Sequence, residues 1–230
     1  MKWRGVSEKA AVPSPIDVPL REKLMEIKAG IAQYVRPDNQ AINERAIREL
    51  TDSGIAQNIL PVGANAPEFT LPDQNGNQLS SLSLLAKGPL IISFFRGRWC
   101  PFCVAEIEAW REWLPSVHDA GGHFVAISPM QVRHNFFMAD QHKLNFPILS
   151  DAGNQVAHKF GLAYGVPDYQ KQLYRSVFVN LPHLNGDDSW ELPLPATYVI
   201  GRDGNVLFAY ASANYMERAE PADALAVLRS

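Results

Sequence analysis

The segment LIISFFRGRWCPFC, residues 90–103, runs from an apolar strand into a pair of cysteines. Residues 90–95 form an almost continuous apolar run, which is typical of a central strand covered on both of its faces. Pro101 suits the first position of a helix, because its missing N–H would have no intrahelical partner there. The segment therefore predicts a buried strand, a short turn and a helix that begins at Pro101.

The sequence around this segment alternates between strand and helix patterns from residue 64 onward, which indicates an α/β fold. Asn75-Gly76 and Asp203-Gly204 are typical of hairpin turns. Further strands are expected at residues 69–71, 78–79, 124–128, 196–200 and 205–211. Helices are expected at residues 101–117, 131–144, 153–160 and 221–228, and a longer connection with a short helix near residues 169–174 is expected across residues 164–195.

The first part of the chain is expected to form a helical extension at residues 1–60, followed by a domain at residues 61–230. Two helices are expected in the extension, capped by Asp17 and Asp38. We interpret the extension as a packing or dimerisation arm, with an interface within residues 17–60. The inward face of its first helix is expected to carry Leu20, Leu24, Ile27 and Ile31.

The composition of the 230 residues is that of an ordinary globular protein, with 47% hydrophobic and 20% charged residues. The formal net charge of -3 gives no reason to expect nucleic acid or an anionic membrane as partner. No apolar run is long enough to cross a bilayer, and the N-terminus lacks the apolar core of a secretory signal. A cytoplasmic location is therefore expected.

The two cysteines, Cys100 and Cys103, are the only ones in the chain. A disulfide at this spacing closes a very small loop and stabilises little through chain entropy, so a catalytic or metal-binding role is favoured over a structural one. Structural zinc needs four protein ligands and catalytic zinc three, whereas only two thiols are available. His134 and His142 lie eight residues apart, which does not suit joint ligation. We expect neither a metal nor another cofactor.

The two sulfurs are expected to differ in reactivity. Cys100 falls at the helix N-cap, where unpaired N–H groups and the helix dipole favour the thiolate, and Arg96 and Arg98 add positive charge unless the strand or loop points either of them away. Cys103 lies on the apolar face of the helix and should be the more buried sulfur. Geometry therefore favours Cys100 as the attacking sulfur and Cys103 as the resolving one. The same face carries Ile107, Trp110, Leu114 and Val117.

Four stretches, taken in order and spacing, resemble the peroxiredoxins of the alkyl hydroperoxide reductase and thiol-specific antioxidant (AhpC/TSA) family. They are GANAPEFTL (63–71), RGRWCPFC (96–103), FPILSD (146–151) and LPLPATYVI (192–200), followed by Asp203-Gly204. The likeness covers roughly residues 60–229 and is closest to the branch with a C-x-x-C motif. It implies a thioredoxin-like α/β fold, with a central mixed sheet flanked by helices.

The resemblance leaves the role of each cysteine open. Peroxiredoxins carry a Thr-x-x-Cys signature, whose threonine helps to bind the peroxide. Matched by fold, that threonine falls on Cys100 and the peroxidatic cysteine on Cys103. Matched by the Cys-Pro dipeptide, the peroxidatic cysteine falls on Cys100.

Other features of the site resemble thioredoxin-like reductases instead. Pro195 stands where related peroxiredoxins often have an arginine, and where those reductases have a cis-proline. This favours a cis bond there, with a trans proline that ends a loop before a strand as the alternative. Trp99 resembles the aromatic residue that covers a thioredoxin dithiol, whereas Phe94 replaces the buried thioredoxin acid. Whether Arg96 or Arg98 replaces the missing arginine stays open.

The leading hypothesis from this resemblance is reduction of peroxides through the Cys100/Cys103 dithiol, restored by an external thiol donor of the thioredoxin or glutaredoxin type. The alternative is a thiol–disulfide oxidoreductase acting on protein or small-molecule disulfides. A third hypothesis is a non-catalytic redox sensor built on the same fold. A homodimer is expected from the family.

Overall fold

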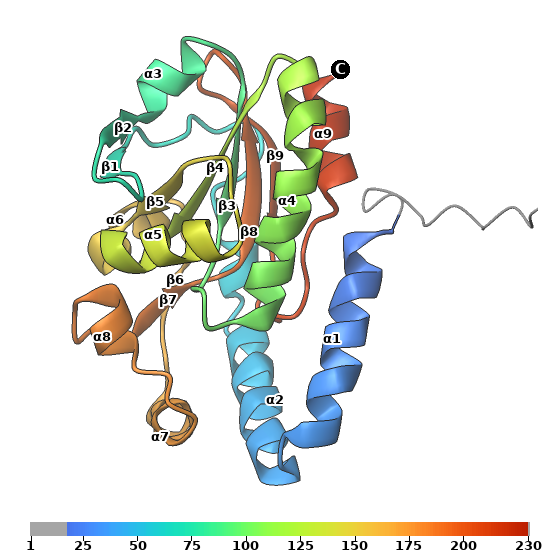
Figure 1. The fold of residues 1–230 in the computed structure, drawn as a ribbon, viewed down its shortest axis with the longest axis vertical. Coiled ribbons are helices and arrows are strands. Elements are labelled where there is room, and N and C mark those ends of the chain that lie inside the picture. The colour runs from blue at the N-terminus through green and yellow to red at the C-terminus, as the bar shows by residue number, and fades with distance from the viewer. Residues whose placement is uncertain (1–17, 230) are drawn as a thin grey trace, which may run out of the picture.

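The computed structural model describes residues 18–229, and Figure 1 shows their arrangement. The centre of the molecule is a mixed five-stranded sheet in the order β5-β4-β3-β8-β9. The strand β3 pairs in parallel with β4 and antiparallel with β8. These strands are β3 (Leu90–Phe94), β4 (His123–Ser128), β5 (Ile148–Ser150), β8 (Ala196–Ile200) and β9 (Val206–Ala211).

Helices cover both faces of this sheet, which explains why all five residues of β3 are buried. Ile91 points into the cluster formed with α4 (Pro101–Asp119) and α9 (Pro221–Leu228). Its neighbours Leu90 and Ile92 point into the opposite cluster, to which α3 (Ser81–Leu85) and α6 (Gln155–Lys159) contribute. Two-sided burial removes the polar alternation that a half-exposed strand would show. The predicted fold class, a mixed sheet flanked by helices, is confirmed.

The remaining elements surround the sheet. The predicted hairpin at Asn75-Gly76 joins β1 (Thr70–Pro72) to β2 (Gln78–Ser80). The helix α5 (Val132–Gln141) follows β4, and the 3-10 turns η2 (Ile55–Gln57) and η3 (Ala152–Asn154) are short connectors.

The connection at residues 164–195 holds more structure than the sequence predicts. The expected short helix is α7 (Asp168–Ser176). A further helix, α8 (Leu181–Asn185), and a two-stranded ladder of β6 (Ala163–Gly165) with β7 (Glu191–Pro193) were not predicted. Each strand has only three residues, too few for a period to show in the sequence.

The N-terminal arm consists of α1 (Leu20–Tyr34) and α2 (Pro37–Asp52), which run beside each other in Figure 1. Asp17 lies outside the described residues. Asp38 is not the cap of α2: Arg36 occupies the N-cap and Pro37 the first position, because proline is favoured there. The predicted inward face of α1 is confirmed, with Leu20 and Leu24 buried and Ile27 and Ile31 packed against the same core.

No helix within residues 18–229 is both long enough and apolar enough to span a lipid bilayer.

Candidate active site

The two cysteines lie where β3 gives way to α4. Cys100 is the N-cap residue of α4 and Pro101 its first residue, as predicted. Both thiols are free and buried, with exposed fractions of 2% for Cys100 and 0% for Cys103. Cys100 lines a pocket with a volume of about 270 Å³, and Cys103 is not among the residues that line it. A small molecule that enters this pocket therefore meets the sulfur of Cys100 first.

The walls of this cysteine pocket come from three parts of the chain: the N-terminal arm, the turn at Cys100, and the segment from α7 towards α8. The sequence predicts Trp99 beside the dithiol, and its ring lines the pocket and packs against Tyr174, with centroids 5.2 Å apart. The lining residues are Lys28, Ile31, Val35, Asn39, Asn43, Arg96, Trp99, Cys100, Pro101, Phe102, Leu173, Tyr174, Val177, Val179, Tyr215 and Met216.

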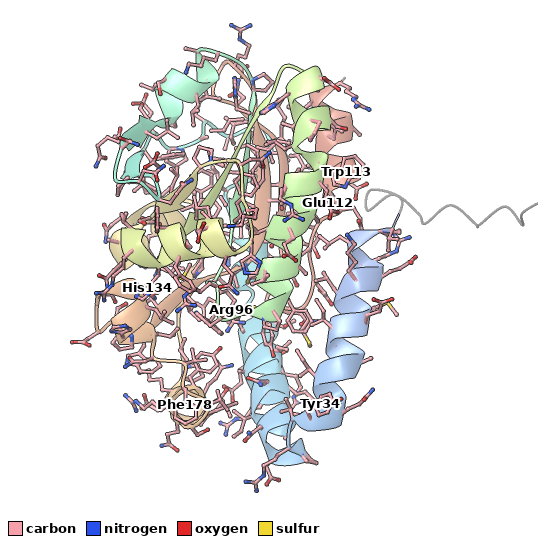
Figure 2. The ribbon with its side chains drawn as sticks, in the orientation of Figure 1. Tyr34, Arg96, Glu112, Trp113, His134 and Phe178 are labelled. Carbon is pink, nitrogen blue, oxygen red and sulfur yellow. The ribbon has the colours of Figure 1, made fainter. Side chains whose placement is uncertain are left out.

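Arg96 is buried in the interior of the molecule, with an exposed fraction of 1% (Figure 2). Its guanidinium lies between two aromatic rings, 4.8 Å from the centroid of Trp99 and 4.4 Å from that of Tyr215. It also donates a hydrogen bond to the hydroxyl of Tyr174. No carboxylate within residues 18–229 pairs with this cation, so the aromatic faces and the phenol oxygen supply its compensation.

Arg96 favours ionisation of Cys100. Burial by itself would raise the pKa of the Cys100 thiol, but a hydrogen bond from Cys103 and the positive charges of Arg96 and Arg218 lower it to about 6. The pKa of Cys103 is raised well above its usual value, by burial first and then by its hydrogen bond to Cys100. At neutral pH the pair therefore carries a thiolate on Cys100 and a thiol on Cys103.

Arg98 does not join this group. Its guanidinium lies over the ring of Phe137 on α5, 5.0 Å from the centroid, and thus points away from the two sulfurs. Of the two arginines considered from the sequence, the structure thus places Arg96 and not Arg98 at the pocket of Cys100. Residues i and i+2 of an extended segment point to the same side, but Gly97 between Arg96 and Arg98 adopts a φ of 145° and turns the chain, so that the two side chains diverge.

A buried ion pair beneath Cys103 was missed by the sequence analysis. Arg218 lies with its Nη2 3.1 Å from the Sγ of Cys103, and its Nε donates to the carboxylate of Glu106. Ser93 on β3 donates a further hydrogen bond of 3.0 Å to Glu106. Burial raises the pKa of Glu106 to about 7, although Arg218 and the Ser93 hydrogen bond act in the opposite direction.

The sequence holds one signal for this pair. Glu106 follows Cys103 by three positions and so falls on the same face of α4, where its neighbours are apolar. An acid on such a face needs a buried cation nearby. Nothing in the sequence identifies Arg218 as that cation, because it lies 112 residues away from Glu106.

Pro195 is buried, but the bond that precedes it is trans, since no peptide bond within residues 18–229 is cis. The expectation of a cis bond was wrong. The chain runs extended from β7 into β8: the N–H of Leu194 donates to Leu162, and the carbonyl of Pro195 accepts from Ser212. A trans bond allows this continuous extended path. Pro195 is also not among the residues that line the cysteine pocket.

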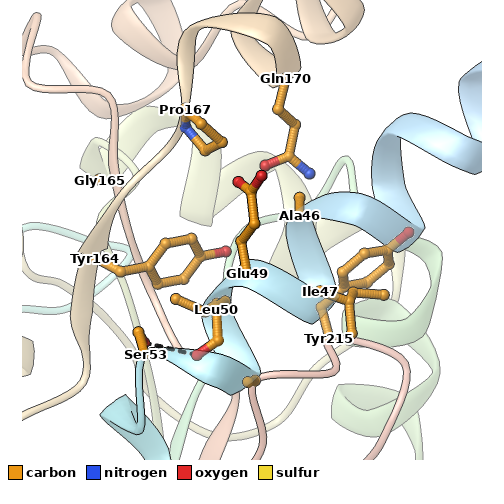
Figure 3. Close-up of a pocket in the computed structure, with 11 residues that line it drawn as sticks. Ala46, Ile47, Glu49, Leu50, Ser53, Tyr164, Gly165, Pro167, Gln170 and Tyr215 are labelled. Carbon is orange, nitrogen blue, oxygen red and sulfur yellow. Dashed lines mark hydrogen bonds between the residues drawn. The ribbon is translucent and has the colours of Figure 1, made fainter.

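A second pocket, of about 170 Å³, lies between α2 and the segment that holds Tyr164 (Figure 3). It contains no cysteine, but Tyr215 lines both pockets. Burial raises the pKa of Tyr164, whereas the neighbouring Arg96 lowers it. Arg96 is therefore enclosed by aromatic side chains from both pockets.

The histidines do not form a metal site. His142 pairs with Glu108 at 2.9 Å, whereas His134 packs against His183, with ring centroids 5.3 Å apart. Within residues 18–229, no group of three or more His, Cys, Asp or Glu side chains is arranged to hold a metal ion.

The dithiol lies at the first turn of a helix that follows the central strand of a mixed sheet, beside a buried guanidinium. This arrangement is that of a thiol-based oxidoreductase of the thioredoxin-like fold. The model of the AhpC/TSA family matches residues 62–209. The chain therefore belongs to the AhpC/TSA family.

Individual relatives agree with this assignment. A putative peroxiredoxin of Mycobacterium tuberculosis is 29% identical over 120 residues, which cover 52% of this chain and 78% of the relative. A chloroplastic peroxiredoxin Q of Sedum lineare is 33% identical over 100 residues, 44% of this chain and 53% of the relative. The crystal structure of peroxidoxin BcpB from Mycobacterium tuberculosis is similar, with a TM-score of 0.59 and 26% sequence identity. The matched region covers 74% of this chain and 97% of the BcpB chain.

Proposed function

We propose that this protein is a thiol-dependent peroxidase that reduces hydroperoxides through Cys100 and Cys103. The Cys100 thiolate attacks the outer oxygen of the peroxide: an S–O bond forms as the O–O bond breaks, and the leaving oxygen takes up a proton as water or alcohol. The Cys103 thiol then condenses with the sulfenic acid, which forms the disulfide and releases water. An external thiol donor returns two electrons and restores both thiols.

The observation that carries this proposal is the pairing of a low-pKa sulfur with an open pocket. Cys100 lines the pocket and has a pKa lowered to about 6, whereas Cys103 is sealed in the core. The thiolate is the form that attacks an O–O bond. The peroxiredoxins among the relatives support the same chemistry.

The assignment of Cys100 as the attacking sulfur is tested by single-turnover oxidation of the two serine variants. Cys103→Ser should still react rapidly with hydrogen peroxide and accumulate a sulfenic acid on Cys100, detected by its mass. Cys100→Ser should react no faster than a free cysteine. The opposite pattern would place the peroxidatic role on Cys103, where the peroxiredoxin fold register puts it.

A thiol–disulfide oxidoreductase is the second candidate, favoured by Trp99 at the rim of the pocket. The trans bond at Pro195 removes one of the features that motivated it. Insulin reduction with a dithiol donor discriminates the two functions. We expect a turnover far below that of peroxide reduction in the same buffer, and a higher one would favour disulfide exchange.

The partners follow from the cycle and from the surface of the arm. The disulfide requires a donor of the thioredoxin or glutaredoxin type, which fits a reducing compartment such as the cytoplasm. Met25 and Tyr34 on α1 are 68% and 87% exposed, which supports a homodimer formed through the arm. Sedimentation equilibrium tests this: a monomer at micromolar concentration would exclude it.

A further inference from the structure

The N-terminal arm forms one wall of the cysteine pocket. Lys28 and Ile31 of α1, its C-cap residue Val35, and Asn39 and Asn43 of α2 line the same space as Cys100. The family model begins only at residue 62, so this wall comes from outside the shared family segment. The arm therefore does more than pack against the fold, because it shapes a pocket that is lined by Cys100.

Hydrogen bonds hold the arm against the rest of the chain. The N–H groups of Leu20 and Arg21 donate to the carboxylate of Glu220, at 2.8 and 2.9 Å. At the other end, Gln170 on α7 donates to Asn43 at 3.2 Å. The side chain of Gln40 donates to the carbonyl of Val35 at 2.8 Å and so ties α2 to the end of α1. These bonds fix both arm helices, and therefore the width of the pocket.

The pocket is much larger than hydrogen peroxide needs. Its volume is about 270 Å³, whereas one water molecule occupies about 30 Å³ of liquid and hydrogen peroxide contains only one more oxygen atom. The wall opposite the arm is apolar, with Leu173, Val177 and Val179, and the arm adds Ile31 and Val35 beside its polar residues. A small polar peroxide gains nothing from such surfaces, whereas an apolar organic group is stabilised by burial against them.

We propose that the arm makes this pocket a binding site for the organic group of bulky, apolar hydroperoxides, so that arm residues determine substrate size. The inference rests on the proposed peroxidase function. In the bound state the O–O group lies at Cys100, and the organic group fills the space between Val35 and Val179. The reaction is that given above, and the organic group leaves as the alcohol.

Filling the pocket from the arm tests the inference. Val35→Trp adds a large side chain to the wall without touching the cysteines or Arg96, and Asn39→Phe does so independently from α2. Val62→Trp is the matched control, because Val62 is exposed and does not line the pocket. The readout is the second-order rate of Cys100 oxidation by cumene hydroperoxide and by hydrogen peroxide.

We expect Val35→Trp to lower about tenfold the ratio of the rate with cumene hydroperoxide to the rate with hydrogen peroxide, because the larger substrate loses the space for its organic group. Asn39→Phe should change the ratio in the same direction. Val62→Trp should change the rate with neither substrate. Unchanged selectivity in both filled variants, with the hydrogen peroxide rate showing an intact fold, would overturn the inference and leave the peroxidase function standing. If wild type reduced neither peroxide faster than a free thiol does, the proposed function would fail, and the inference with it.

A measurement on wild type covers the case in which both filled variants fail to fold. The alcohol product, 2-phenylpropan-2-ol, should compete with hydrogen peroxide for the pocket and slow the oxidation of Cys100 in a saturable way. Glycerol, an alcohol without an apolar group, is the control and should not compete. A lack of competition by the aryl alcohol would also overturn the inference.

Discussion

Two arginines act on the dithiol from opposite sides. Arg96 stands at the pocket beside Cys100, whereas Arg218 contacts Cys103 in the core. Arg218 pairs with the carboxylate of Glu106, which offsets part of its charge, whereas Arg96 pairs with no carboxylate in the part of the chain that the structure describes. The positive charge that is not paired with a carboxylate is thus that of Arg96, which lines the pocket together with Cys100. This asymmetry agrees with a thiolate on Cys100 and a thiol on Cys103.

The first prediction concerns the ionisation of Cys100. Since the pKa of this thiol is lowered to about 6, the thiolate should be present above that pH and lost as the pH falls through it. Alkylation by iodoacetamide should therefore be about tenfold slower at pH 5 than on its plateau above pH 7. Arg96→Gln should move the midpoint upward, because a positive charge is removed. A wild-type midpoint near that of a free cysteine would contradict the assignment.

The second prediction concerns Arg218. Arg218→Leu leaves the buried Glu106 without its cation, and loss of one partner from a buried pair costs about 3 kcal/mol or more in the free energy of unfolding. Urea denaturation measures this loss. Arg218→Lys keeps the positive charge but cannot contact both Glu106 and Cys103 as the guanidinium does, so it should lower the free energy of unfolding by less than Arg218→Leu. Equal stability of wild type and Arg218→Leu would show that the ion pair contributes nothing net.

At the scale of elements, the turn between β3 and α4 depends on Gly97. A Cβ at this position would lie 2.6 Å from the Nε1 of Trp99, and the φ of 145° disfavours any L side chain. Gly97→Ala should therefore destabilise the protein by about 1–3 kcal/mol and change the fluorescence of Trp99. The control is Gly30→Ala in α1, where a Cβ meets nothing within 4 Å. This control should be neutral or slightly stabilising, and equal losses in both variants would contradict the argument.

The sequence predicted elements whose own residues carry the signal. The apolar run at residues 90–95 and Pro101 predicted β3 and the start of α4, and the hairpin at Asp203-Gly204 is present as expected. The cap of α2 was misplaced by two positions because Pro37, not Asp38, sets its start. Elements held together by distant partners, such as β6 and β7, left no local pattern to detect.

The whole-molecule arrangement was the least predictable part of the site. The spacing of Cys100 and Cys103 identified the dithiol, and the burial of Cys103 follows from its helical face. Arg218 and the arm come close to the dithiol only in the tertiary fold. Arg218 lies 115 residues after Cys103 in the sequence, and the arm lies before residue 60. No periodicity encodes such contacts, so they were not foreseen.

A further prediction applies to the stability of the whole molecule. Burial raises the pKa of Glu106 from 4.5 to about 7, so the folded state holds a proton that the unfolded state releases. The stabilisation is complete below about pH 4.5 and is lost as the pH rises towards 7, a change of about 3 kcal/mol in the free energy of unfolding. Glu106→Gln should flatten this part of the stability profile, measured by urea denaturation of the reduced protein. Parallel profiles for variant and wild type would show that Glu106 is ionised throughout.

The tie between Glu220 and the first turn of α1 has a consequence for how related proteins are compared. These hydrogen bonds join a segment before the family-matched residues 62–209 to a segment after them. The same two flanking segments contribute Val35 to the cysteine pocket and Arg218 to the surroundings of Cys103. Chains can thus share the matched segment equally well and still surround their sulfurs differently. Grouping them by what their flanks contribute would sort them by reactivity, whereas grouping them by the matched segment alone sorts them by ancestry.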